Sequence, residues 1–300
     1  MPTPTHPGSQ PAERLRVAMV GAGLMGSQIG CEYALGGHTV TYLVRDTAAS
    51  RARVDNAFAV ARESGIADGD VSAADVAIVT SLDELDAGTD LVVESIPERL
   101  EVKRDVLGAI AERLPDAIVA SNTSSIPLTE LGEAIGAPER TLGTHYWNPP
   151  LLMPPVEIIR GEQTRDDVVE RVTAVIEALG KEPLHVQRDV PGLVWNRLQL
   201  ALLREVLWLV ENGVATPRAI DRIVSSGMAR RLRYTGPFET VALGGVHSWT
   251  NVAENLFPVL SNATEPGDIE RWLDRSDEEL AAAKTRRDRG LAAELTSERA

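Results

Sequence analysis

Residues 16–26 read RVAMVGAGLMG, and this stretch decides the fold of the first part of the chain. A short apolar run ends in the pattern G-x-G-x-x-G, and a helix-like segment follows it. The first glycine permits a tight turn out of a strand, the second lets the backbone approach a pyrophosphate, and the third lets the helix pack closely on the strand. The free N–H groups at the start of that helix would point at the phosphates. The stretch therefore predicts a dinucleotide-binding turn, made by Gly21, Gly23, Leu24, Met25 and Gly26.

The segments after this turn alternate between strand-like and helix-like patterns. A second apolar run, Thr39–Val44, follows about twenty residues on, where a dinucleotide-binding unit places its second strand. Residues 51–75 have small and charged side chains at helical spacing and are expected to form a helical excursion between strands. Further strand-like runs are Leu91–Ser95, Ile118–Ser121, Thr141–Tyr146, Val156–Ile159 and Leu184–Gln187, with helical patterns at Glu101–Leu114 and Asp166–Leu179. This alternation predicts an α/β fold, a Rossmann-type doubly wound parallel sheet with helices on both faces.

The pattern changes after the turn at 189–192, which reads DVPG. Residues 193–210 are apolar on nearly all sides, which predicts a buried helix and a plausible core for a homodimer. Helical patterns without a clear strand follow, and the charged stretch 277–300 is expected to be a solvated helix or a frayed tail. We therefore expect a disordered leader over 1–14, a dinucleotide-binding domain over 15–190, and an all-α domain over 191–300 that serves substrate binding and dimerisation.

The composition limits the classes of partner. The chain has 44 Asp and Glu against 30 Lys and Arg, which argues against nucleic acid and anionic membranes as general partners. The single cysteine, Cys31, excludes an intramolecular disulfide and fits a reducing compartment, so we expect a cytoplasmic protein. Cys31 is expected to be a small buried apolar residue rather than a reactive thiol. No run is long and apolar enough for a membrane span, and no Cys/His cluster has zinc spacing, so we expect no membrane and no metal.

Six blocks lie in the order in which one enzyme family carries them. They read GAGLMG at 21–26, ESIPERLEVK at 94–103, SNTSS at 121–125, GTHYWNP at 143–149, PGLVWNR at 191–197 and GPFE at 236–239. With these blocks the chain resembles the 3-hydroxyacyl-CoA dehydrogenase family, including its members of the lambda-crystallin/L-gulonate dehydrogenase and carnitine dehydrogenase types, which act on free hydroxy acids. The resemblance implies hydride transfer between NAD(P) and the 3-hydroxy or 3-oxo group of a hydroxy acid or its CoA thioester.

His145 is the candidate general base for this chemistry. Oxidation of a secondary alcohol requires loss of the hydroxyl proton, which a base that titrates near neutrality accepts best. His145 follows a predicted strand at its carboxyl end, where doubly wound folds place their sites. Glu157 would fix the tautomer of the imidazole from its other nitrogen. By resemblance, Ser124 and Asn196 hold the substrate oxygen. The alternative for a serine of this block is the N-cap of a helix before Pro127, a role for which Ser125 and Thr129 are the candidates.

The resemblance also implies cofactor contacts. Glu98 and Lys103 are expected on the nicotinamide-ribose side, with Asn148 assisting; the alternative for the first two is an exposed charge pair at a helix start. NAD-specific enzymes usually end the second strand with Asp or Glu, but here Val44 stands at that position and Arg45 follows. Since an arginine can pair with a 2′-phosphate, the residues favour NADP slightly over the family's usual NAD.

The substrate is less well defined by the sequence. Fatty-acid members of the family carry lysines after the second strand for the phosphates of coenzyme A, whereas 51–75 holds arginines among acidic residues and no lysine. A CoA thioester is therefore doubtful. The basic run Arg230, Arg231 and Arg233 could meet a carboxylate or could simply be a basic helix C-terminus. The alternatives are a family member that acts on another alcohol or an aldehyde, and a nucleotide-binding protein without turnover.

Overall fold

The computed structural model describes residues 13–67, 71–273 and 275–299. This part of the chain divides into two compact units, one of residues 13–193 and 281–299 and one of residues 194–280. The expected leader, 1–14, lies outside the described residues except for 13 and 14.

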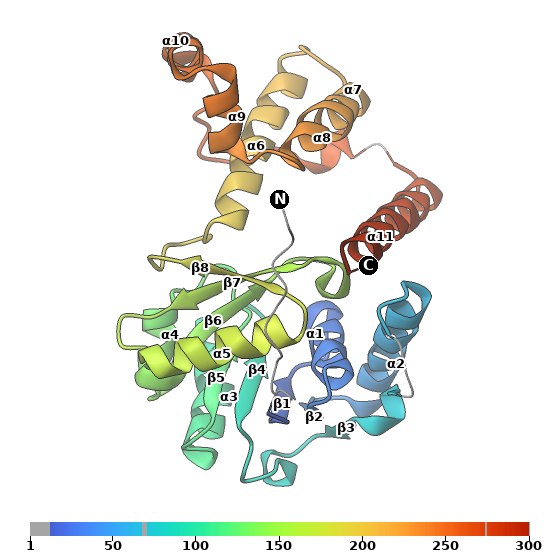
Figure 1. The fold of residues 1–300 in the computed structure, drawn as a ribbon, viewed down its shortest axis with the longest axis vertical. Coiled ribbons are helices and arrows are strands. Elements are labelled where there is room, and N and C mark those ends of the chain that lie inside the picture. The colour runs from blue at the N-terminus through green and yellow to red at the C-terminus, as the bar shows by residue number, and fades with distance from the viewer. Residues whose placement is uncertain (1–12, 68–70, 274, 300) are drawn as a thin grey trace, which may run out of the picture. The chain divides into compact units, whose positions relative to one another are not determined.

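The first unit is built on one sheet, which has eight strands among the described residues in the order β3-β2-β1-β4-β5-β6-β7-β8 (Figure 1). The strands span Arg16–Val20 (β1), Thr39–Leu43 (β2), Ala77–Val79 (β3), Leu91–Glu94 (β4), Ile118–Ser121 (β5), Thr141–Tyr146 (β6), Pro155–Arg160 (β7) and Glu182–Val186 (β8). All neighbouring pairs are parallel except β6 and β7, which are antiparallel. The predicted α/β, doubly wound fold is confirmed.

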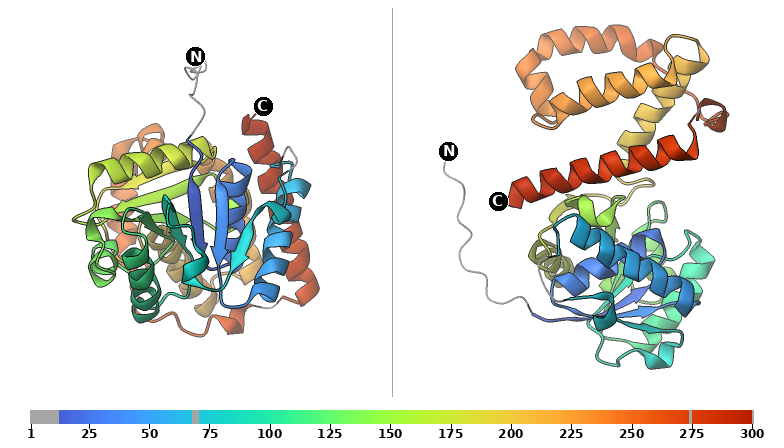
Figure 2. Two further views of the ribbon diagram at one scale, coloured as in Figure 1. Left: turned by 90° about the horizontal axis from the view of Figure 1, so that it is seen from below. Right: turned by 90° about the vertical axis from the view of Figure 1, so that its right-hand side faces the viewer.

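Helices cover both faces of this sheet (Figures 1 and 2). They are α1 (Leu24–Leu35), α2 (Thr47–Glu63), α3 (Leu100–Arg113), α4 (Leu128–Ala134) and α5 (Asp166–Ala178). Successive side chains of a strand point to opposite faces, and β1 shows the result: Val17 and Met19 join one core, Ala18 and Val20 the other. The first core packs under α1, α2 and α5, and the second under α3 and α4. The continuous apolar run 17–20 of β1 is what two covered faces require.

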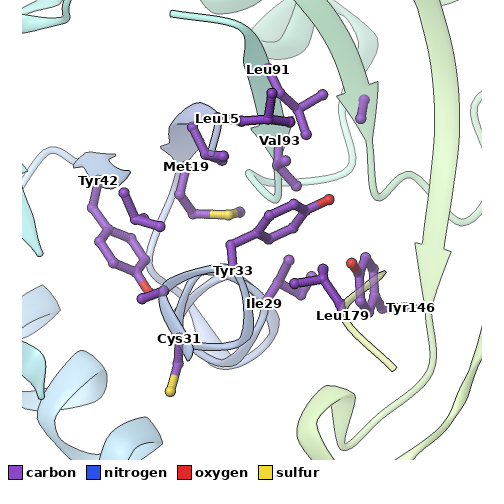
Figure 3. Packing of buried hydrophobic residues seen from close by; sticks show 14 of the residues in the cluster. Leu15, Met19, Ile29, Cys31, Tyr33, Tyr42, Leu91, Val93, Tyr146 and Leu179 are labelled. Carbon is purple, nitrogen blue, oxygen red and sulfur yellow. The ribbon is translucent and has the colours of Figure 1, made fainter. Parts of the chain in front are cut away.

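Helix α1 is sunk deeply into the first core (Figure 3). Tyr33 and Cys31 on this helix are fully buried, and the hydroxyl of Tyr42 on β2 donates to the carbonyl of Ser27, 2.9 Å away. Burial raises the pKa of the Cys31 thiol to about 12, with a further contribution from the neighbouring charge of Glu32. Cys31 is therefore the buried apolar residue that the sequence predicted.

Two features of the sheet differ from the sequence prediction. The strand β3 lies just after the predicted helical excursion and was missed, because three residues are too few to show an alternating pattern. The strand β7 runs antiparallel to β6, so the two form a hairpin joined by residues 147–154 rather than a crossover unit. An apolar run does not encode strand direction, and the short connection excludes a helical crossover.

The strand order reverses at β1, since the chain moves outward to β2 and β3 and then returns to β4 on the other side. Ligands of open α/β sheets bind at this switch point, beyond the carboxyl ends of the strands. The segments that follow β1, β4, β5 and β6 begin with Gly21, Ser95, Asn122 and Trp147. This edge of the sheet is therefore the expected place of the site.

The first unit reaches a sharp reversal at the position where the sequence pattern changes. Gly192 and Leu193 adopt positive φ values of 81° and 51° in succession. Left-handed backbone is unfavourable for a leucine, and burial of its side chain in the second core offsets this cost.

Helices are the regular structure of the second unit, and no strand occurs among its described residues. Its main helices are α6 (Trp195–Glu211), α7 (Pro217–Ile223), α8 (Ala229–Leu232), α9 (Pro237–Gly244) and α10 (Val246–Leu256). The prediction that α6 is buried is wrong for the single chain, because Leu198 and Leu200 are 61% and 55% exposed while Leu207 and Val210 are buried. The helix has more apolar sides than its own unit covers. The last helix, α11 (Asp277–Arg299), agrees with the predicted helix, and its Leu295 is buried.

No helix within the described residues combines the length and the apolar character that crossing a bilayer requires.

Candidate active site

The glycine turn between β1 and α1 has the geometry that a pyrophosphate needs. Gly21 has a φ of 95°, and a Cβ there would come within 2.6 Å of the Ser95 carbonyl oxygen. A Cβ on Gly26 would overlap the carbonyl oxygen of Gly21, so the helix packs against the turn only because this residue is glycine. Gly23, by contrast, has open space where its Cβ would lie, and α1 begins there without a capping side chain or an acidic residue in its first turn.

These features fit a dinucleotide. The open side of Gly23 leaves room for a phosphate close to the backbone, and the uncapped helix start offers N–H donors and the positive end of the helix dipole. Leu24 is exposed beside the turn, while Met25 packs against the first core. The turn is thus able to hold the pyrophosphate of NAD(P) without any basic side chain.

The carboxylate nearest the end of β2, that of Asp46, is engaged at the start of α2. Val44 is buried and donates its N–H to the carbonyl of Val79. Asp46 caps α2, where its side chain accepts from the N–H of Ala49 at 3.0 Å. Arg45 between them is exposed. The arginine is therefore the side chain at this strand end that is placed to meet a ligand in solvent.

A buried charge cluster lies at the ends of β4 and β5. Glu94 and Lys103 are 0% and 1% exposed, and the ammonium lies 2.6 Å from one Glu94 carboxylate oxygen and 3.2 Å from Glu98. The other Glu94 oxygen accepts from the hydroxyl of Ser121 at 2.5 Å. Lys103 is therefore not part of an exposed charge pair at a helix start. It is a buried cation shared by two carboxylates, and its contact with the cofactor stays a prediction.

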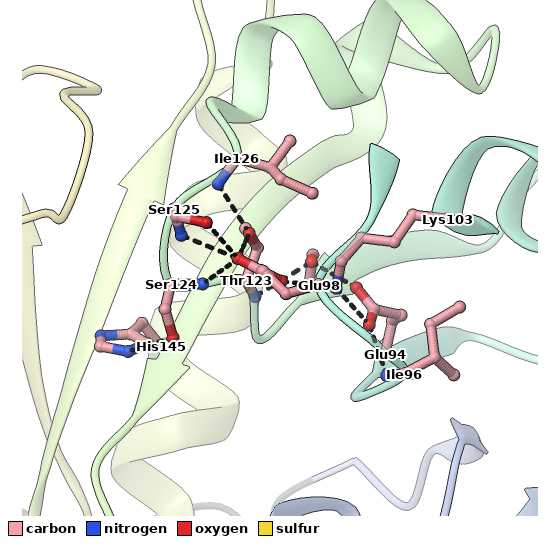
Figure 4. Close-up of polar contacts among 10 residues, drawn as sticks. Glu94, Ile96, Glu98, Lys103, Thr123, Ser124, Ser125, Ile126 and His145 are labelled. Atoms are coloured by element: carbon pink, nitrogen blue, oxygen red, sulfur yellow. Dashed lines mark hydrogen bonds and ion pairs between the residues drawn. The ribbon is translucent and has the colours of Figure 1, made fainter. Parts of the chain in front are cut away.

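Glu98 organises the loop that carries Ser124 (Figure 4). One carboxylate oxygen accepts from the hydroxyl of Thr123 at 2.6 Å, from the N–H groups of Ser124 and Ser125 at 2.8 Å each, and from the Ser125 hydroxyl at 3.0 Å. Partial burial disfavours the ionised carboxylate, but the Thr123 hydroxyl, the Lys103 charge and the two N–H groups outweigh it and lower the pKa of Glu98 to about 2. Glu98 is thus a fixed anion that holds the 123–125 loop.

His145 and Glu157 face each other across the hairpin. They are directly paired in the register of β6 and β7, both are buried, and His145 Nδ1 lies 2.6 Å from a Glu157 carboxylate oxygen. Since a carboxylate can only accept, Nδ1 carries the proton and Nε2 is left as the acceptor. The Ser124 hydroxyl lies 3.1 Å from Nε2 (Figure 4). The indole N–H of Trp147 donates to the same Glu157 oxygen at 3.3 Å.

The alternative role of Ser124 as a helix cap does not match the structure. Helix α4 starts after Pro127 without a capping hydroxyl, and the N–H groups of Leu128 and Thr129 donate instead to Asp189. Ser125 is bound to Glu98. Ser124 therefore directs its hydroxyl to His145.

The structure thus brings together His145, Glu157, Ser124 and, through its loop, Glu98. Asn148 is exposed after β6, and Asn196 lies on α6 in the second unit, so their roles stay predictions. Sequence reasoning missed the functions of Glu94 and Trp147. The signal for Glu94 was present, because a single acid at the end of the apolar strand LVVE has to be paired if it is buried.

Comparison with known proteins agrees with this geometry. The model of the 3-hydroxyacyl-CoA dehydrogenase NAD binding domain matches residues 16–190, and the model of the C-terminal domain of the same enzymes matches residues 192–285. The chain belongs to the 3-hydroxyacyl-CoA dehydrogenase family. It is therefore an oxidoreductase with an NAD(P)-binding domain, of the class that acts on CH–OH groups, as the sequence motifs predicted.

Several relatives have defined activities. The chain is 37% identical over 250 residues to 5-formyl-3-hydroxy-2-methylpyridine 4-carboxylate 5-dehydrogenase of Mesorhizobium japonicum. The match covers 82% of this chain and 81% of that protein. It is 40% identical over 199 residues to L-carnitine dehydrogenase of Pseudomonas aeruginosa, where the match covers 66% of this chain and 62% of the relative. A solved structure of a pyridine-carboxylate 5-dehydrogenase described as an NAD+-dependent dismutase has a TM-score of 0.85 and 32% identity, covering 94% of this chain and 97% of that one.

Replacement of Glu98 by glutamine is expected to change the acid stability of the protein. Because the pKa of Glu98 falls from its ordinary 4.5 to about 2 on folding, the unfolded chain binds more protons between these values and stability rises with pH across this window. The stabilisation is therefore complete above about pH 4.5 and is lost as the pH falls toward about 2. Urea unfolding of the wild type and Glu98→Gln should show a large difference in unfolding free energy near neutral pH that shrinks as the solution is acidified.

The exposed Glu101, near the start of α3, provides the control. Glu101→Gln should leave the pH dependence of unfolding as in the wild type. A difference between wild type and Glu98→Gln that stays constant with pH would contradict the role of the ionised carboxylate.

Proposed function

We propose that the protein interconverts the 3-hydroxy and 3-oxo forms of a small carboxylic acid, with His145 as the general base and acid. The observation that carries the proposal is the continuous line from the Glu157 carboxylate through His145 to the Ser124 hydroxyl, with contacts of 2.6 and 3.1 Å. Such a line suits proton removal from a bound alcohol, because Glu157 orients the imidazole from Nδ1, and Nε2, which faces the Ser124 hydroxyl here, is the acceptor for a substrate hydroxyl that takes this position.

Each residue has a separate task in this reaction. Bound NAD(P) supplies the acceptor or donor of the hydride. Nε2 of His145 takes the substrate's hydroxyl proton during oxidation and returns it during reduction. Glu157 then stabilises the imidazolium through Nδ1, and Ser124 donates to the substrate oxygen, where negative charge develops. By family resemblance, Asn196 supplies a second donor to that oxygen.

A free acid suits the chain better than a CoA thioester. Arg51, the first arginine of the segment 51–75, donates to the carbonyl oxygens of Ala73 and Val76 at 2.5 and 3.5 Å. It therefore serves the local fold and is not available for the phosphates of coenzyme A. The acidic residues Asp68 and Asp70 of this segment lie outside the described residues.

A second candidate function is oxidation of an aldehyde, since the relative in Mesorhizobium japonicum is named for a formyl group on a pyridine carboxylate. A hydrated aldehyde presents the same CH–OH group to His145 as a secondary alcohol does. Parallel assays with 3-hydroxy acids, their CoA thioesters and aromatic aldehyde acids, with NAD(P)H formation and product analysis, distinguish these substrates.

His145→Asn is expected to lower kcat/KM by about 10²–10⁴-fold, the usual contribution of a general base. Asparagine keeps a polar side chain but cannot take the proton at neutral pH. Ser124→Ala should reduce kcat by about 10² if its hydroxyl stabilises the developing charge. Both variants should bind NAD(P)H as the wild type does. Full activity in His145→Asn would eliminate the proposed base, and binding without any turnover in the wild type would favour the non-enzymatic alternative.

We further propose that the cofactor is NADP rather than NAD. Support comes from the end of β2, where Val44 is buried, Asp46 is engaged as a helix cap and Arg45 is exposed. A guanidinium in this position suits a 2′-phosphate, and the missing carboxylate removes the usual acceptor for the ribose 2′-hydroxyl.

Titration of intrinsic tryptophan fluorescence with NADPH and NADH tests this preference. The wild type should bind NADPH more tightly, and Arg45→Asp should lose that advantage and gain affinity for NADH, because a carboxylate can accept from the 2′-hydroxyl. Tighter binding of NADH that does not respond to Arg45→Asp would assign the chain to NAD, the cofactor that the family model is named for.

We also propose a cytoplasmic homodimer. The single cysteine supports the compartment. The exposed apolar side chains of Leu198 and Leu202, one turn apart on the same side of α6, support the dimer, since a monomer seldom leaves a contiguous apolar face in water.

Light scattering should give the mass of a dimer for the wild type and of a monomer for Leu198→Glu/Leu202→Glu, because charges at the centre of an apolar interface are costly to bury. Leu273→Glu, at an exposed leucine outside α6, is the control and should remain a dimer. A monomeric wild type would contradict the proposal.

A further inference from the structure

A second buried ion pair lies away from the candidate catalytic residues. The ammonium of Lys181, just before β8, lies 2.6 Å from a carboxylate oxygen of Glu32 on α1. The two side chains are 1% and 6% exposed. The same ammonium donates to the carbonyl oxygens of Pro150 and Met153 at 2.6 and 3.0 Å. A lysine ammonium has three hydrogens, and here each has an acceptor.

The carbonyl groups that Lys181 holds belong to the connection between β6 and β7. This connection, residues 147–154, joins the strands that carry His145 and Glu157. One turn before Glu32 on α1, the side chain of Gln28 reaches the N–H of Leu151 at 3.5 Å. One face of α1 and one lysine therefore fix the middle of the connection from two sides.

The connection begins at Trp147, whose indole donates to the Glu157 oxygen that also accepts from His145. A shift of residues 147–154 would move this indole and the ends of both strands. The N-terminal end of α1 follows directly on the glycine turn. The same helix thus holds the β6–β7 hairpin, which carries His145, and follows the turn that is expected to bind the pyrophosphate.

The ion pair is not explained by stability alone. Taking two charges out of water costs free energy that their attraction often only just repays, so apolar side chains of similar size can replace a buried pair with little loss of stability. Apolar side chains cannot, however, hold two carbonyl groups at a defined distance. What the pair supplies is a fixed geometry for the connection.

We propose that Glu32 and Lys181 are positioning residues for the reaction at His145. They act through residues 147–154, which set the indole of Trp147 and the carboxylate of Glu157 behind the imidazole. This inference rests on the proposed function, because it needs His145 and Glu157 to perform the chemistry.

The test replaces both charges together. Lys181→Met alone would leave the Glu32 carboxylate buried and uncompensated and could fail to fold, whereas Glu32→Leu/Lys181→Met removes both charges. The double variant should fold, although with a lower urea midpoint than the wild type, since the Pro150 and Met153 carbonyls lose their donor. It should bind NAD(P)H within about threefold, because the glycine turn is intact. Its kcat should fall at least about tenfold, as a small misplacement of a base does. Amide hydrogen exchange of the peptide that spans 147–154 should become faster, which reports the loosened connection without any turnover.

Two further variants complete the experiment. Glu32→Gln leaves the buried ammonium without its countercharge and should lower the urea midpoint, but its amide oxygen and the two carbonyls still accept from Lys181, so kcat and slow exchange should be retained. Arg165→Met/Asp167→Leu removes an exposed pair with a 2.9 Å contact and should change neither. Wild-type kcat or unchanged exchange in Glu32→Leu/Lys181→Met overturns the inference, and so does failure of this variant to fold while Glu32→Gln is active. His145→Asn, assayed alongside, distinguishes failure of this inference from failure of the proposed function, because full activity of His145→Asn would overturn the proposed function itself.

Discussion

The antiparallel pairing of β6 with β7 is the constraint on which the candidate site depends. It sets His145 and Glu157 opposite each other in register, so the contact between imidazole and carboxylate is fixed by backbone hydrogen bonds and not by flexible side chains. A parallel neighbour would have required a long crossover, and Glu157 would then have come from the far end of a separate element. The short hairpin is what makes the pair rigid.

Rigidity of this kind requires that every buried charge nearby be compensated. Glu94 and Glu98 share Lys103, and Glu32 is paired with Lys181. Each cluster joins elements that are distant in the sequence, and each holds a loop at the carboxyl edge of the sheet. Hydrogen bonds of defined direction offset the free energy lost when these ions leave water. The clusters therefore contribute to the geometry of the site more than to the stability of the fold.

Much of this structure could be predicted from sequence, and the exceptions have physical causes. The glycine turn and the apolar strands were predictable because steric demand and burial on two faces leave direct marks in the chain. The antiparallel direction of β7 could not be predicted, because an apolar run does not encode strand direction, and β3 has too few residues to show a pattern. The enclosure of Lys103 by two carboxylates could not be predicted either, since its position in a motif does not reveal its partners, and its contact with the cofactor stays a prediction. The helix cap by Asp189 joins residues about sixty positions apart, beyond the range of any local pattern.

The burial of Cys31 has a consequence for the chemistry of the protein in an oxidising environment. Peroxides and electrophiles react with the thiolate form of cysteine, and a thiol with a pKa of about 12 inside the core is almost entirely protonated and inaccessible. Because the chain has no second cysteine, the protein has no reactive thiol of its own to lose. A cysteine placed at any exposed position would therefore be the sole reactive thiol, and a spectroscopic label attached there would report on that position alone.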